Sequence, residues 1–140
     1  MKHFLTTIVC CGLVCSCLAG CSKETARQSL EGVVTLDNAP LAKGSILFQP
    51  MPGTTSPSCG GTISDGRFSI APAGGAACGK FRVQITATRP TGKKVVHRQS
   101  GNMMDEIVQY IPSRYNEQSK LEAVVESGKN RFSFDLTSKD

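Results

Sequence analysis

The residues of this 140-residue chain that are best suited to chemistry are its seven cysteines. Most of them crowd near the N-terminus, and these are Cys10, Cys11, Cys15, Cys17 and Cys21. Thiolates bind zinc, but the usual pairs separated by two residues are absent from this cluster. Only one histidine, His97, follows the cluster, and a lone histidine does not build a metal site. We therefore expect no metal site and no cofactor.

Hydroxyl nucleophiles are present without the context that catalysis needs. Thr62, Ser64 and Ser113 lie in no nucleophile-elbow pattern, and no general base is placed near them in the sequence. Asp65 could be imagined as a calcium ligand, but its neighbour Gly66 makes a turn the simpler explanation. On these grounds we expect that the protein is not an enzyme.

The first residues have the pattern of an export signal. Lys2 provides a positive start, and residues 4–14 form an apolar run. This run is well short of the roughly 20 residues that span a bilayer. Small residues follow it, as they do before a cleavage site.

The segment Leu18, Ala19, Gly20 and Cys21 resembles the lipobox of bacterial lipoproteins, in which cleavage precedes the cysteine and its sulfur receives a diacylglyceryl group. The resemblance implies that residues 1–20 are a lipoprotein signal peptide and that Cys21 is lipidated. The protein is then extracytoplasmic and anchored to the cell membrane or the outer membrane, facing the periplasm or the surface. Ordinary secretory cleavage is the alternative, because Ala19 and Gly20 are also small enough for it.

The mature chain has the size of one domain. Residues 21–29 are polar and predict a lipidated N-terminus and tether, and residues 30–138 predict the folded domain. Cleavage removes one lysine, so the formal charge of +5 falls by one. That mild excess is far from the basic stripe of a nucleic-acid-binding protein, so we expect no nucleic-acid partner.

Short apolar alternations separated by turn residues predict an all-β domain without helices. Asp65 and Gly66 between two such runs indicate a hairpin, with Ile63 facing Phe68. Each strand has one apolar and one polar face, which favours antiparallel sheets. We expect a seven-stranded antiparallel Greek-key β-sandwich of transthyretin-like or immunoglobulin-like form. The expected strands cover residues 32–36, 45–49, 60–63, 67–70, 79–87, 121–125 and 131–137.

The order of these elements resembles carboxypeptidase-regulatory-like domains, also called transthyretin-like or prealbumin-like domains. Residues 32–41 look like the opening strand and turn of that family, and residues 61–70 look like its threonine–Asp-Gly–phenylalanine hairpin. Residues 79–85 are similar to its Gly-x-Tyr-x-Val strand, with Phe81 in place of tyrosine. Residues 111–116 look like a subgroup of small bacterial lipoproteins.

The resemblance implies a prealbumin-like sandwich with no known catalytic activity. Hydroxyisourate hydrolases share that fold, but they carry active-site histidines and end in Tyr-Arg-Gly-Ser. This chain instead ends in Ser138, Lys139 and Asp140.

Cys59 and Cys78 are the cysteines left after cleavage and lipidation. In an oxidising compartment they are candidates for one disulfide, which would contribute roughly 3 kcal/mol by closing a loop of about 20 residues. By the alternation along a strand, Cys59 falls on the same inward face as Ile63, whereas Cys78 falls on the outward face with Arg82. Two separate thiols are therefore the alternative.

A basic stretch surrounds residues 90–92 and is a candidate anion-contacting patch. Its members could contact anionic headgroups or acidic polysaccharide, although a solvated loop or hairpin explains them more simply. The residues of this patch are Arg89, Lys93, Lys94 and Arg98.

These observations favour a non-enzymatic, lipid-anchored module of the cell envelope with an accessory, adhesion or protein-interaction role. Its expected partners are the membrane, through the lipid, and an envelope protein or polysaccharide. A carbohydrate-binding module for envelope or extracellular polysaccharide is the alternative, with Tyr110 and Tyr115 as its available aromatic side chains.

Overall fold

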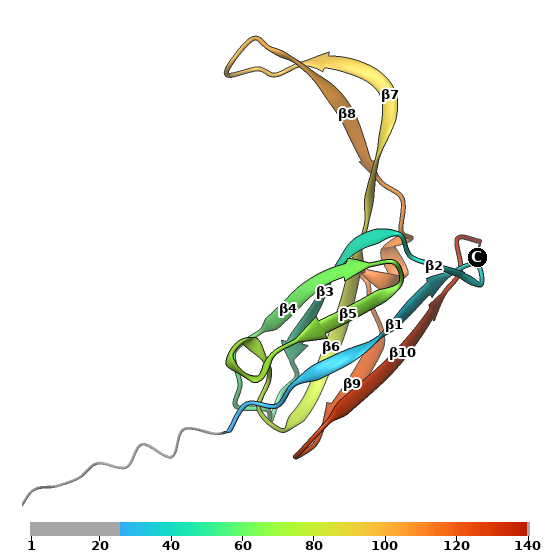
Figure 1. The fold of residues 1–140 in the computed structure, drawn as a ribbon. Coiled ribbons are helices and arrows are strands. Elements are labelled where there is room, and N and C mark those ends of the chain that lie inside the picture. Colours follow the sequence, from blue (N-terminus) through green and yellow to red (C-terminus); the bar gives the residue numbers. More distant parts are fainter. Residues whose placement is uncertain (1–25, 140) are drawn as a thin grey trace, which may run out of the picture.

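The computed structural model describes residues 26–139, which contain the predicted domain (Figure 1). The lipobox and the predicted lipidation site, residues 18–21, lie outside the described residues. The described part of the chain contains no helix with the length and hydrophobicity that crossing a bilayer requires.

The described chain is all-β, as the sequence predicts. Its helical elements are single 3₁₀ turns, η1 (Pro72–Gly74) and η2 (Ser113–Tyr115). The strands are β1 (Leu30–Leu36), β2 (Ala39–Pro40), β3 (Lys43–Pro50), β4 (Cys59–Ser64), β5 (Arg67–Ile70), β6 (Gly79–Thr86), β7 (Thr88–Val96), β8 (Met103–Gln109), β9 (Leu121–Val125) and β10 (Asn130–Leu136).

One long sheet forms the body of the domain. Its strands follow the order β10-β1-β5-β4-β3-β6-β9, and β2 pairs with β1 at one end. The pairs along this path are antiparallel except for β1 and β10, which run parallel from Leu30 beside Asn130 to Leu36 beside Leu136. The expectation of purely antiparallel pairing is therefore wrong at this edge. No hairpin joins these two strands, which lie 100 residues apart, so no turn dictates that they run in opposite directions.

Every second residue of the longer strands in this sheet faces the interior, because successive side chains in a strand point to opposite faces. Phe81, Val83 and Ile85 alternate along β6 and are fully buried, as the sequence predicts. The sheet curls so that rings from distant strands meet. The Phe48 ring on β3 lies 5.8 Å from the Phe132 ring on β10, measured between centroids. One continuous core results.

The predicted Asp-Gly hairpin is present between β4 and β5. Asp65 and Gly66 both have positive φ, of 48° and 72°, which is the backbone geometry of a tight two-residue turn. The amide of Gly66 donates to the carbonyl of Leu41 at 2.8 Å, and the amide of Val34 donates to the carbonyl of Gly66 at 2.8 Å. The turn therefore joins the hairpin to β1 and helps to fix the register between β1 and β5.

Candidate functional site

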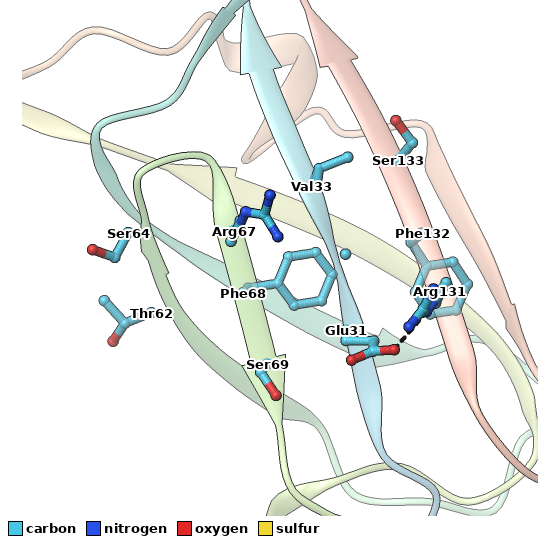
Figure 2. Close-up of a pocket in the computed structure, with 11 residues that line it drawn as sticks. Glu31, Val33, Thr62, Ser64, Arg67, Phe68, Ser69, Arg131, Phe132 and Ser133 are labelled. Carbon is cyan, nitrogen blue, oxygen red and sulfur yellow. Dashed lines mark hydrogen bonds and ion pairs between the residues drawn. The ribbon is translucent and has the colours of Figure 1, made fainter.

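A groove of about 730 Å³ lies on the outer face of β4, β5, β1 and β10 (Figure 2). The outward positions of these strands supply most of its lining, because their alternate residues face the core. The lining residues are Glu31, Gly32, Val33, Thr62, Ser64, Arg67, Phe68, Ser69, Arg131, Phe132 and Ser133.

Strand register arranges the polar side chains of the groove in two rows across the sheet. In the first row, Glu31 on β1 lies between Arg131 on β10 and Ser69 on β5. In the second row, Val33 lies between Ser133 and Arg67. The groove is thus built by the pairing of β1 with both of its neighbours.

The first row contains an ion pair that neutralises one arginine. Arg131 Nε donates to Glu31 Oε1 at 2.6 Å, as the dashed line in Figure 2 shows. This hydrogen bond, and then the positive charge of Arg131, hold the pKa of Glu31 below its usual value. Because the pKa is lower in the folded state, the ion pair stabilises the fold at any pH above the ordinary pKa of a glutamate. The contribution is lost as the pH falls through the lowered value.

Arg67 in the second row remains available to a ligand. Its guanidinium has no ion pair or hydrogen bond with any other residue of the described range 26–139. A guanidinium presents a planar fork of donors that matches a carboxylate in a bidentate arrangement. The hydroxyls of Ser64, Ser69 and Ser133 line the same groove and can donate or accept hydrogen bonds. The groove is therefore suited to an acidic, hydrogen-bonding ligand.

No member of the groove was singled out as a ligand contact by the sequence analysis. The signal available was the outward parity of Arg67 and Ser69 around Phe68, and of Arg131 and Ser133 around Phe132. That parity places each residue on a face, but it does not say that β10 lies next to β1. The missing information was the parallel strand pair.

The predicted disulfide between Cys59 and Cys78 is not formed, and this expectation is corrected. Both are free thiols; Cys59 is buried, whereas Cys78 is exposed. Cys59 lies beside Phe48, which lies beside Val83 on β6. Cys78 comes before the first residue of β6, and that start is about 13 Å along the strand from Val83 at 3.3 Å per residue. A disulfide needs Cα atoms within about 7 Å.

We expect a maleimide reagent to label Cys78 and to spare Cys59 in the native protein near neutral pH. Burial raises the pKa of the Cys59 thiol, so it stays protonated to a higher pH, and the thiolate is the reactive form. Peptide mapping by mass spectrometry measures the labelling of each cysteine. Labelling of Cys59 after denaturation provides the control. An unlabelled Cys78 in the native protein would contradict this prediction and support the disulfide instead.

The structure does not gather the predicted basic patch into one site. Arg89, Lys93 and Lys94 lie along β7, and Arg98 follows that strand. Lys94 Nζ pairs with Asp105 Oδ1 on β8 at 2.7 Å, which removes one of the four charges from an anion-binding role. The strand extends these residues along a projecting ribbon instead of a compact patch.

Tyr110 and Tyr115 are not freely exposed aromatic side chains. Both pack against the core from partly buried positions. The guanidinium of Arg89 lies 5.3 Å from the ring centroid of Tyr110, and that of Arg114 lies 4.9 Å from the ring centroid of Tyr115. The Tyr115 hydroxyl also accepts a hydrogen bond from the Thr137 amide at 3.2 Å. These contacts give both residues a packing role.

The described residues 26–139 hold no group of three or more His, Cys, Asp or Glu side chains that could bind a metal ion. No protein-family model matches the chain, and no curated protein is significantly similar to it. Among solved structures, the chain is similar to the crystal structure of a 9R-lipoxygenase from Cyanothece PCC8801, with 16% identity and a TM-score of 0.39. The similarity covers 81% of this chain and 16% of the lipoxygenase chain.

The expectation that the chain is not an enzyme gains no support from this comparison, since the matched structure is that of an enzyme. A likeness at this TM-score carries no argument for an activity. We therefore withdraw that expectation and assign no reaction to the groove.

Proposed function

We propose that this chain is a lipid-anchored interaction module of the cell envelope, tethered through Cys21 and binding an acidic segment of a partner protein in the groove. The observation that carries the proposal is the unpaired guanidinium of Arg67, which lies among hydroxyls in the same groove as Arg131, the arginine that pairs with Glu31. A partner carboxylate would supply the missing counter-charge.

The environment of the two tyrosines favours a protein partner over a polysaccharide. Sugar recognition commonly uses exposed aromatic faces, and both Tyr110 and Tyr115 have a guanidinium over the ring. The groove instead offers charge and hydrogen bonding.

We further propose that the body is a prealbumin-like seven-stranded Greek-key β-sandwich of the carboxypeptidase-regulatory-like family. The Asp65–Gly66 hairpin and the alternation of Phe81, Val83 and Ile85 support this proposal, since both belong to the motifs that carry the resemblance. The meeting of Phe48 with Phe132 across the curled sheet is compatible with two packed layers.

The first arm of the test concerns the anchor. We expect Cys21→Ala to abolish acylation and to release the protein from the membrane fraction, because no sulfur remains for the lipid. Intact mass of the purified protein and fractionation of cells measure the two effects. Retention of Cys21→Ala in the membrane fraction would contradict the anchor.

The second arm concerns the groove. A photo-crosslinking residue placed at Ser69 is expected to capture a protein partner in intact cells. Arg67→Ala should lower capture by roughly ten-fold or more, the scale of one lost hydrogen-bonded charge pair. Arg82→Ala is the matched control, because Arg82 is also exposed on a strand but lies outside the groove. Equal effects of the two substitutions would show that the groove is not the binding site. Capture of a polysaccharide would show that the partner is not a protein.

A further inference from the structure

Strands β7 and β8 form a two-stranded ribbon that projects from the body (Figure 1). Every residue of β7 is exposed, and in β8 only Glu106 is partly buried. At its base, Gln109 Oε1 accepts from the amide of Ala87 at 2.9 Å, and the amide of Tyr110 donates to the carbonyl of Ala87 at 3.1 Å. The sequence analysis expected a solvated loop or hairpin here and did not predict β8.

The ribbon exposes more apolar surface than a solvated hairpin requires. Val96, Met103 and Ile107 are 60%, 63% and 61% exposed, and the register places them on one face because opposed residues share a face. Val95, Met104 and Val108 are exposed on the other face. A two-stranded ribbon is marginally stable alone in water, and additional strands are the usual remedy.

The two edges of the ribbon differ. The β7 edge is interrupted by Pro90, by a register shift between Pro90 and Lys94, and by Gly92 with a φ of 83°. Proline, bulges and lysine are the devices that protect an edge strand from pairing. The β8 edge runs for seven residues, Met103–Gln109, without proline, glycine or a lysine. Only the β8 edge is open to another strand.

Both carboxylates of β8 already have a partner within the ribbon, but only that of Asp105 is charged. Asp105 pairs with Lys94, and Glu106 Oε2 accepts a hydrogen bond from Thr91 at 2.6 Å. Another strand on the β8 edge therefore has to keep its own carboxylates away from Glu106, whose charge the Thr91 hydroxyl does not neutralise.

We infer that β8 pairs antiparallel with β8 of a second copy of this chain. The result is a four-stranded sheet, β7-β8-β8-β7, whose two outer edges are the protected β7 strands. One open edge and one protected edge produce a closed dimer, whereas two open edges would produce a fibre. The ribbon lies at the opposite end of the body from the start of β1, so under the proposed anchoring the body separates it from the anchored end of the chain (Figure 1). That placement favours a second copy over a lipid surface.

The carboxylates disfavour two positions of the two-fold axis along β8. An axis at Asp105 or at Glu106 would place like charges directly opposite each other, which is unfavourable. An axis at Ile107 instead pairs two isoleucines and leaves Glu106 opposite Val108 of the partner. Opposed residues in an antiparallel pair have Cα atoms about 4.5–5.5 Å apart, within disulfide reach.

Oxidative cross-linking of the full chain tests this pairing. In a Cys78→Ser background, we expect Ile107→Cys to form a disulfide-linked dimer on a non-reducing gel. Val96→Cys is the matched control, since Val96 is equally exposed on the same face but lies on the protected strand. The parent Cys78→Ser protein should stay uncross-linked. Equal cross-linking at both positions would overturn edge pairing.

Association in solution gives a second readout. The detergent-solubilised full chain should be dimeric by light scattering, and Ile107→Lys should raise the dissociation constant by roughly ten-fold or more, because two lysines would face each other. Val96→Lys should leave the constant unchanged. A wild-type chain that stays monomeric at every concentration would overturn the inference and leave the β8 edge to a different partner.

Discussion

Phe48→Ala is expected to lower the free energy of unfolding by about 3–5 kcal/mol, the range for deleting a buried phenylalanine ring. The Phe48 side chain is fully buried. Its ring lies 6.0 Å from that of Phe68 on β5 and 5.8 Å from that of Phe132 on β10. Removing it leaves a cavity where the curled sheet closes on itself. Urea denaturation followed by circular dichroism measures the loss.

Two control variants isolate the cause. Phe48→Leu keeps most of the apolar volume and should cost less than the alanine variant. Leu47→Ala changes the neighbouring residue, which is 36% exposed on the opposite face, and should cost much less than Phe48→Ala. If Leu47→Ala and Phe48→Ala had equal costs, the inward face of β3 would be wrongly assigned.

Local chemistry made parts of this fold predictable. The Asp65–Gly66 turn follows from two residues that both tolerate positive φ, and the structure has both in that region. The alternation of Phe81, Val83 and Ile85 likewise assigned the inward face of β6 correctly. In each case the information lies within a few residues, where backbone preference and burial act together.

Long-range pairing was not predictable in the same way. Nothing in β1 or in β10 states that they run parallel at an edge of the sheet, because no turn connects them. The groove depends on that pair, since it brings Arg131 beside Glu31. The polar parity of single strands therefore identified outward residues but not the site that they form together.

The cysteine pair and the ribbon show two further limits. The alternation of the sequence already placed Cys59 and Cys78 on opposite faces, which disfavours a disulfide between them. In the structure both are free thiols, in agreement with the alternation. Residues 103–109 are apolar at both parities, so they carry no signal of one buried face. Alternation of apolar and polar residues marks a strand with one buried face, so it does not reveal a strand such as β8 that is exposed on both faces.

Gly32→Ala is expected to lower the free energy of unfolding by about 2–3 kcal/mol, within the range for overpacking a well-packed core. A Cβ atom at this position would lie 2.2 Å from the carbonyl oxygen of Phe132 and 2.8 Å from the Phe68 ring. The first of these neighbours is backbone, so β10 would have to move away from β1. Thermal or urea unfolding measures the loss.

Because Glu31 and Val33 flank Gly32, displacement of β10 should also separate Glu31 from Arg131 and weaken capture at the groove. Gly74→Ala is the control, because a Cβ there meets only Ile70 at an ordinary contact distance of 3.7 Å and should be nearly neutral. If Gly32→Ala were as stable as Gly74→Ala, β10 could not lie where it does beside β1. The groove would then lose Arg131 and Ser133, so this one substitution tests the strand pair on which the proposed site depends.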